Sequence, residues 1–342
     1  MRRSIKTVQF FRISIPRLIF VCLLIWGFSH AALAEEKIST FGKYQGYSRE
    51  IYDSWQRSSR YLTMRDGVKL AMDIIRPAKN GQVAEDKLPV LWTHTRYRRA
   101  VERHGSISSI ANAPYVQTLL KHGYVVAAVD VRGSGASYGT WQGIWTQQES
   151  LDAHEITQWL GTRPWSNGKV GMFGGSYLGI TQLMCAGKGP SHLKAIFPMV
   201  ALYDLYPLAY HGGIFFNDYI QHWSDLTLML DTQSVAAPVD NDPGKKQLKR
   251  AIQQHHNNRP LIHILSSLPY RNSKDEFTGV QPYYLWHPAA FTREISQSGV
   301  AIYLWCGWFD AFTKDGFLMY KNFTNPKKLV MGHPRPYPIQ AP

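Results

Sequence analysis

Four short apolar runs, separated by helical stretches, are the feature that most restricts the fold of this chain. The runs cover residues 89–95, 124–131, 170–173 and 193–200. The run at 124–131 is almost continuously apolar, which is typical of a strand buried on both faces. Helical patterns at 115–122, 150–160 and 177–186 lie between the runs. Strands that alternate with helices predict a doubly wound, largely parallel α/β sheet.

Further elements extend this sheet at both ends of the pattern. Two β-rich runs flank Asp66-Gly67, which predicts a hairpin, and Asn167-Gly168 predicts a turn. The alternation stops after residue 202, where aromatic and polar helical pieces follow, including 210–223 and 243–256. It resumes with strands at 300–306 and 328–331 around a helix near 315–323. We therefore expect an α/β core, 35–202 and 297–332, with a helical cap at 203–296 and an irregular tail at 333–342.

Residues 1–34 have the pattern of a secretory signal peptide. Five basic residues and no acid accompany an apolar run over 18–28, and the small-residue triplet 32–34 follows. An uncleaved anchor is the alternative, although the apolar stretch is shorter than the roughly 20 residues that a membrane span needs. We expect cleavage after Ala34, export to the periplasm or medium, and no stable membrane span thereafter.

Composition excludes several other classes of protein. The net charge is +14, but five of the 38 Lys and Arg residues lie in 1–34, so 33 basic and 24 acidic side chains remain downstream. These charges are scattered, so we expect no nucleic-acid partner, and a basic surface-binding protein is the weaker reading. Cys185 and Cys306 lie in apolar surroundings typical of buried free thiols, though a bridge between them stays open. Neither a metal motif nor a cofactor motif is present, and we expect no cofactor.

The most informative segment carries a serine between small residues at a strand-to-helix junction. It runs from Val170 through Gly174-Gly175-Ser176-Tyr177 to Gly179. In a nucleophile elbow the serine sits on a strained turn, so its neighbours must be small and the following amide points at the developing oxyanion. A strict Gly-x-Ser-x-Gly is absent, because Leu178 takes the fifth place. The position within an α/β pattern nevertheless favours Ser176 as a nucleophile over an ordinary turn.

A serine nucleophile needs further groups, which follow the later strands. Asp310 comes after the strand at 300–306, where an α/β-hydrolase carries its orienting acid; a helix N-cap is the alternative. Tyr97 follows the strand at 89–95 and is placed to offer a hydroxyl or amide to the oxyanion. Its alternative is a surface aromatic in a basic loop. Cap aromatics such as Tyr219 and Trp223 suit either an apolar acyl group or core packing.

Four segments carry a resemblance to a known family: residues 66–70 (DGVKL), 130–137 (DVRGSGAS), 164–179 (PWSNGKVGMFGGSYLG) and 307–310 (GWFD). In these segments the chain resembles the CocE/NonD hydrolases, a group with X-Pro dipeptidyl-peptidases, cocaine esterase, cephalosporin acylases and α-amino acid ester hydrolases. The resemblance implies an α/β-hydrolase fold with a helical cap. It also implies that Ser176 is the nucleophile, that Asp310 orients the base, and that the Tyr177 amide and Tyr97 hydroxyl form the oxyanion hole.

Two departures from the family pattern concern the C-terminal residues. The base of the family lies in a Gly-Pro-Trp-x-His motif, whose histidine would fall at Pro336, and the nearest histidine here is His333. The family also continues into a jelly-roll β-sandwich for which no sequence remains. We therefore expect a truncated or frameshifted chain in which His333 is the substitute candidate for the base.

These observations predict a serine hydrolase that cleaves an ester or an amide bond through an acyl-enzyme on Ser176. Its expected partner is a small-molecule or short-peptide acyl substrate, and the oligomeric state is open. Close to Asp310 the chain offers Ala311 and Phe312 rather than acids, which disfavours recognition of a substrate amine there. The alternative is a catalytically impaired remnant that keeps the serine but lacks the triad histidine.

Overall fold

The computed structural model describes residues 39–40, 43–44, 48–233 and 235–332. The predicted signal peptide, the tail at 333–342 and His333 lie outside these residues. The chain divides into two compact units at residues 49 and 50. In the first, β1 (Ser39–Thr40) pairs with β2 (Lys43–Tyr44) as a short antiparallel ribbon. The second unit carries every other element and is described below.

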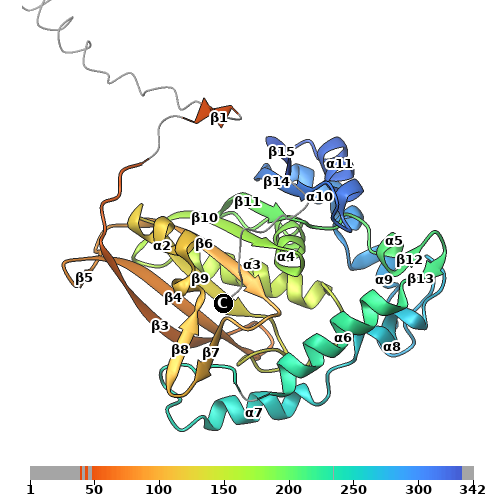
Figure 1. Cartoon of the computed structure of the whole chain (residues 1–342), viewed down its shortest axis with the longest axis horizontal. Coiled ribbons are helices and arrows are strands. Elements are labelled where there is room, and N and C mark those ends of the chain that lie inside the picture. Colours follow the sequence, from red (N-terminus) through yellow and green to blue (C-terminus); the bar gives the residue numbers. More distant parts are fainter. Residues whose placement is uncertain (1–38, 41–42, 45–47, 234, 333–342) are drawn as a thin grey trace, which may run out of the picture. The chain divides into compact units, whose positions relative to one another are not determined.

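The second unit is built on one mixed sheet of nine strands (Figure 1). The strands are β3 (Ser54–Thr63), β4 (Lys69–Lys79), β5 (Gln82–Val83), β6 (Leu88–Thr95), β9 (Val125–Asp130), β10 (Ser166–Gly175), β11 (Leu193–Met199), β14 (Ala301–Gly307) and β15 (Lys327–Gly332). Their order is β15-β14-β11-β10-β6-β9-β4-β3, with β5 paired to β4. The run from β15 to β9 is parallel, whereas β4 and β3 are antiparallel to their neighbours. This arrangement confirms the predicted α/β fold.

Helices cover both faces of the sheet, as the apolar pattern of β9 requires. Every residue of β9 is buried. Val125, Ala127 and Val129 join a core cluster with α3 (Gln147–Gly161) and α4 (Tyr177–Ala186), whereas Val126 faces α2 (Pro114–Lys121) on the opposite side. Successive strand residues point to opposite faces, so a strand covered on both sides is apolar throughout.

The segment expected to be a cap, 203–296, lies between β11 and β14, and we use the name cap for the elements in this interval. It contains α5 (Tyr206–Ala209), β12 (Tyr210–His211), β13 (Ile214–Phe215), α6 (Asn217–Thr232), α7 (Lys246–His255), α8 (Leu261–Ser266), α9 (Pro282–Leu285) and α10 (Thr292–Gln297). The helix expected at 210–223 is wrong in its first part, because β12 and β13 pair around Gly212-Gly213, both at positive φ. After the cap, α11 (Thr313–Asn322) connects β14 to β15.

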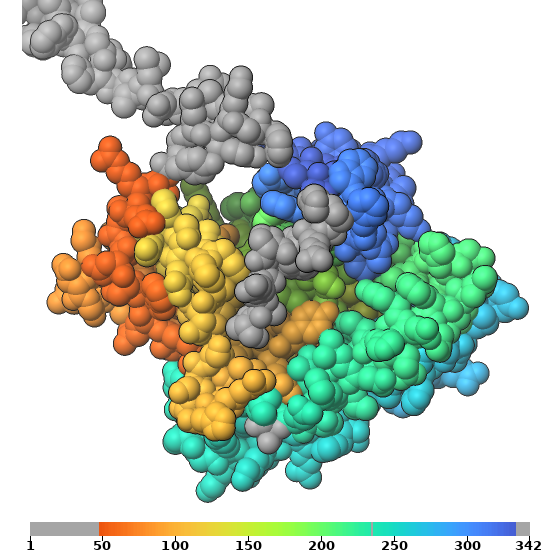
Figure 2. All heavy atoms as spheres, viewed as in Figure 1, coloured from red at the N-terminus to blue at the C-terminus, as the bar shows by residue number. Residues whose placement is uncertain are grey.

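A second ribbon joins the cap to the core. Strands β7 (Ala100–Arg103) and β8 (Ser106–Ser109) form an antiparallel pair. The amide of Glu102 donates to the carbonyl of Val235 at 2.9 Å, and the amide of Ala237 donates to the carbonyl of Ala100 at 3.1 Å. Figure 2 shows the corresponding gold and cyan surfaces in contact. The cap is therefore tied to the core through backbone hydrogen bonds as well as through its two chain connections.

Other local predictions had mixed outcomes. The hairpin at Asp66-Gly67 is confirmed, since Thr63 pairs with Lys69. The turn at Asn167-Gly168 is wrong, because both residues lie inside β10, where Gly168 has φ +81° and the register shifts between Ser166 and Val170. Cys185 and Cys306 are buried free thiols. Among the described residues, no helix is long and apolar enough to cross a bilayer.

Candidate active site

Ser176 occupies a strained junction between β10 and α4. Its backbone angles are φ +56° and ψ −125°, which a residue with a Cβ adopts only under constraint. Its amide is held by the carbonyl of Met199 on the neighbouring β11 at 2.9 Å. The side chain is partly exposed at the carboxyl edge of the parallel strands. Open α/β sheets bind ligands at this edge, so the structure places Ser176 where the sequence predicted a nucleophile.

Two glycines make this junction possible. Gly174 has φ +139°, and a Cβ there would lie 2.6 Å from the Cβ of Leu178. A Cβ on Gly179 would lie 2.9 Å from the carbonyl oxygen of Met199. The close approach between helix and sheet therefore falls at Gly179 in this chain, which is why Leu178 is tolerated at the usual glycine position.

The Tyr97 side chain reaches Ser176 from the loop after β6. Burial raises the pKa of Tyr97, and hydrogen bonds with Trp223 and Ser176 partly offset this effect. The indole nitrogen of Trp223 donates to the Tyr97 hydroxyl oxygen at 3.0 Å. The Tyr97 amide instead donates to the Thr95 hydroxyl at 3.0 Å, so the hydroxyl is the group that faces Ser176. Tyr97 is thus part of the site and not a surface aromatic.

Tyr177 presents two different groups to two different environments. Its amide is the first of α4, and the first amides of a helix have no partner within the helix. Its side chain points into the core, where the hydroxyl donates to a carboxylate oxygen of Glu149 at 2.6 Å and accepts from the indole of Trp141 at 3.3 Å. Only the amide is therefore placed to meet an oxyanion on Ser176.

Asp310 follows β14, two strands from β10 at the same edge of the sheet. One carboxylate oxygen accepts from the amide of Phe312 at 2.8 Å. Burial raises the pKa of Asp310, and this amide lowers it in part. The helix α11 begins at Thr313 with Phe312 as its cap residue, so Asp310 is not its N-cap.

The phenol of Tyr219 on α6 is affected electrostatically by both Tyr97 and Asp310. Burial raises its pKa to about 12, and the nearby Tyr97 and Asp310 add to this rise. A Coulombic effect of this kind requires proximity, so both groups lie near the Tyr219 phenol. The described part of the site therefore contains Ser176, Tyr97, the Tyr177 amide, Tyr219 and Asp310.

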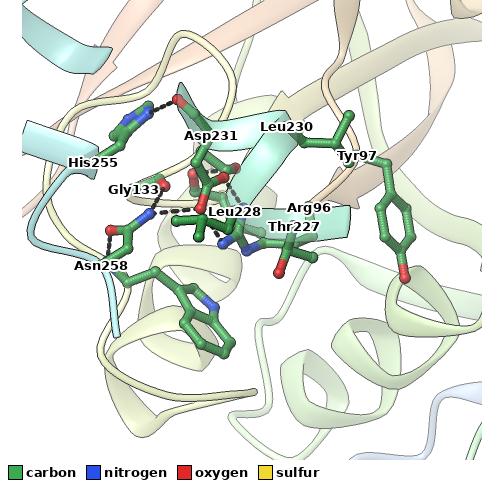
Figure 3. Close-up of polar contacts among 12 residues, drawn as sticks. Arg96, Tyr97, Gly133, Thr227, Leu228, Leu230, Asp231, His255 and Asn258 are labelled. Atoms are coloured by element: carbon green, nitrogen blue, oxygen red, sulfur yellow. Dashed lines mark hydrogen bonds and ion pairs between the residues drawn. The ribbon is translucent and has the colours of Figure 1, made fainter. Parts of the chain in front are cut away.

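Sequence reasoning missed a buried polar cluster that fixes the cap beside this site (Figure 3). Arg96 forms a two-pronged ion pair with Asp231 near the C-terminal end of α6, and the second contact is 2.6 Å long. The side-chain nitrogen Nδ2 of Asn258 donates to a carboxylate oxygen of Asp231 and to the backbone carbonyl of Gly133, both at 2.7 Å. Arg96 lies next to Tyr97 in the chain, but its basic loop gave no signal of a buried partner.

The described residues contain no group of three or more His, Cys, Asp or Glu side chains that could hold a metal ion. The His333 candidate lies outside the described residues, so its role as the base stays a prediction. What the described residues assemble is a strained serine with two hydrogen-bond donors beside it and a carboxylate at the same edge of the sheet. That arrangement is suited to acyl transfer.

Comparison with known families gives one match over most of the chain. Residues 66–335 match the model described as X-Pro dipeptidyl-peptidase (S15 family). A protein of Mycobacterium bovis whose name assigns it to the serine esterases is 29% identical over 305 residues, covering 76% of this chain and 48% of that protein. Cocaine esterase of Rhodococcus is 35% identical over 187 residues, covering 54% of this chain and 31% of that protein. The chain therefore spans about half or less of the length of these curated relatives.

A solved structure shares the fold. The CocE/NonD family hydrolase from Staphylococcus aureus superposes with a TM-score of 0.61 at 24% identity, covering 82% of this chain and 46% of that one. At this level of identity the likeness supports the α/β-hydrolase architecture alone.

Proposed function

The chain belongs to the X-Pro dipeptidyl-peptidase (S15) family of hydrolases, and from this we propose that it is a serine hydrolase that cleaves an ester or amide bond through an acyl-enzyme on Ser176. The observation that carries the proposal is the strained Ser176 junction with the Tyr97 hydroxyl hydrogen-bonded to the serine side chain. Strain of this kind costs about 1–3 kcal/mol and persists mainly where function needs it.

The proposed reaction has two halves. The Ser176 hydroxyl attacks the substrate carbonyl and gives its proton to the base, for which His333 is the candidate. The Tyr177 amide and the Tyr97 hydroxyl donate to the oxyanion as it forms. The base returns the proton to the leaving group, and a water molecule then releases the acid by the same steps in reverse order. Asp310 serves to orient the base and to stabilise its protonated form.

We propose an ester of an apolar acid as the substrate class. Two of the relatives are named as esterases, and the cap presents Tyr219 and Trp223 next to the site. Aromatic side chains of this kind bind apolar groups over large areas. Next to Asp310 the chain carries Ala311 and Phe312, neither of which pairs with a substrate amine. Cleavage of short peptides by the same acyl-enzyme chemistry is the second candidate, favoured by the family match.

A fluorophosphonate probe tests the nucleophile directly. We expect labelling of the full chain, no labelling of Ser176→Ala, and unchanged labelling of the control Ser191→Ala, whose hydroxyl pairs with Gln158 away from the site. p-Nitrophenyl butyrate and an X-Pro p-nitroanilide then separate the two substrate classes. A protein that is folded by circular dichroism but remains unlabelled contradicts the proposal and supports the catalytically impaired alternative.

A further inference from the structure

The cap contributes one hydrogen bond to the oxyanion donor, and its direction is fixed by chemistry. An indole nitrogen can only donate, so the 3.0 Å contact makes the Tyr97 hydroxyl oxygen an acceptor. A phenol has a single hydrogen, which must then point to another acceptor. Ser176 also lies within hydrogen-bonding reach of this hydroxyl, and its contact lowers the Tyr97 pKa, as a donor to the phenol oxygen does. The Trp223 contact thus leaves the Tyr97 hydrogen turned away from the indole and available to an oxyanion that forms on Ser176.

We propose that Trp223 is a positioning residue of the oxyanion hole: its indole N–H keeps the hydrogen of the Tyr97 hydroxyl turned away from the indole, so that it donates to an oxyanion formed on Ser176. This inference rests on the proposed function, because it assigns the cap a role in the chemistry at Ser176. A donor that is already oriented needs no reorganisation when negative charge develops, which is the basis of oxyanion stabilisation.

The loop that carries Tyr97 is bound to α6, the helix that carries Trp223. Both chain neighbours of Tyr97 bind the end of α6: Arg96 pairs with Asp231, and Arg98 donates to the carbonyl of Leu230 at 3.0 and 2.6 Å. Trp223 lies about two turns earlier on the same helix. The loop that carries Tyr97 is therefore fixed to the helix that carries its hydrogen-bond donor (Figure 3).

Aromatic packing fixes the Trp223 ring itself. The ring stacks on Tyr177 with centroids 5.9 Å apart and planes 11° from parallel, and it contacts Trp141 at 5.9 Å and 47°. Packing is thus the competing explanation for Trp223. Trp141 supplies a matched control, because its indole also donates to a tyrosine hydroxyl, but that tyrosine is Tyr177, whose hydroxyl donates to Glu149.

Ester hydrolysis by the full chain separates positioning from packing. We expect Trp223→Phe to lower kcat about ten-fold, the usual effect of one hydrogen bond, with little change in KM. In the Tyr97→Phe background the same substitution should lower kcat no further, whereas Trp141→Phe should leave kcat within about two-fold in either background. An equal loss from Trp223→Phe with and without the Tyr97 hydroxyl overturns the proposal, because packing alone then explains the effect.

A spectroscopic measurement keeps this test independent of turnover. In protein labelled with ¹³Cζ-tyrosine, the Tyr97 line is assigned by its absence in Tyr97→Phe. We expect Trp223→Phe to move this line and Trp141→Phe to leave it in place. Ser176→Ala should shift the Tyr97 resonance in a protein that retains Trp223. The shift that Ser176→Ala causes in the Trp223→Phe background should differ in size.

The kinetic and the spectroscopic experiments distinguish failure of the proposed function from failure of this inference. If the wild-type protein hydrolyses no ester, the proposed function fails, while the spectra still test the role of Trp223. A Tyr97 ¹³C resonance that Trp223→Phe does not shift overturns the inference. A line that moves, with an effect of Ser176→Ala that depends on Trp223, supports it.

Discussion

Glu149 is a buried acid behind the nucleophile, and replacing it with glutamine should remove a pH dependence of stability. One carboxylate oxygen accepts from the Tyr177 hydroxyl, and the other is buried with no hydrogen-bond partner among the described residues. Burial, reinforced by Asp152, raises the pKa of Glu149 from 4.5 to about 8. The folded state therefore favours the protonated acid, whereas the unfolded chain ionises near its ordinary value.

The sign and size of the effect follow from this difference. A group whose pKa is raised in the folded state loses stability as the pH rises from the unfolded to the folded value. Over this window the loss is about 1.4 kcal/mol per pH unit, which reaches about 5 kcal/mol above pH 8. Glutamine keeps the acceptor for Tyr177 and does not titrate. Below about pH 4.5 both proteins should therefore differ by a constant amount.

Urea denaturation followed by tryptophan fluorescence between pH 5 and pH 8 measures the effect. We expect the free energy of unfolding of Glu149→Gln, relative to that of wild type, to rise with pH, by roughly 3 kcal/mol from pH 5 to pH 7. Glu155→Gln on the same helix, with an ion-paired and partly exposed carboxylate, is the control for loss of a charge. Parallel pH profiles for wild type and Glu149→Gln would refute the reasoning.

Three further substitutions test other features of the site. Gly179→Ala should abolish ester hydrolysis, since its methyl group would lie 2.9 Å from the Met199 carbonyl oxygen; a folded, fully active variant contradicts this. Asp231→Asn leaves the buried Arg96 guanidinium without its counter-charge and should cost about 3–5 kcal/mol in urea denaturation, whereas a cost below about 1 kcal/mol argues against the ion pair. Ser176→Gly should be more stable than Ser176→Ala by about 1 kcal/mol in thermal denaturation, because glycine adopts φ +56° without strain; equal melting temperatures count against a strained elbow.

The predicted fold was most reliable where local pattern and tertiary environment agree. The continuous apolar run of β9 and the helix at 177–186 are both confirmed, because burial on two faces and helical periodicity leave direct traces in the sequence. Asn167-Gly168 misled the prediction, since a positive-φ glycine serves a bulge inside a strand as well as a turn. In the cap, the Gly212-Gly213 pair signalled a hairpin that aromatic content obscured.

The site was predictable only as far as its motif extends. Ser176 and its flanking glycines form one local segment, and Tyr97 and Asp310 follow strands whose carboxyl ends meet. Trp223 could not be assigned in this way, because its contact with Tyr97 joins residues 126 positions apart in the chain. No periodicity or motif encodes such a contact. In the sequence, an aromatic residue on an amphipathic helix has the same pattern whether its ring only packs in the core or also orients another side chain.

The insertion of the cap between β11 and β14 has a consequence for the order of folding. These strands are direct parallel neighbours, with Met199 opposite Trp305, yet the whole cap separates them in the chain. Closing so long a loop is entropically slow compared with the pairing of β6, β9 and β10. During synthesis, the segment that carries Ser176 therefore emerges and pairs well before Asp310 reaches it. A nascent chain thus brings Asp310 to the sheet edge that carries Ser176 only after the whole cap has been synthesised.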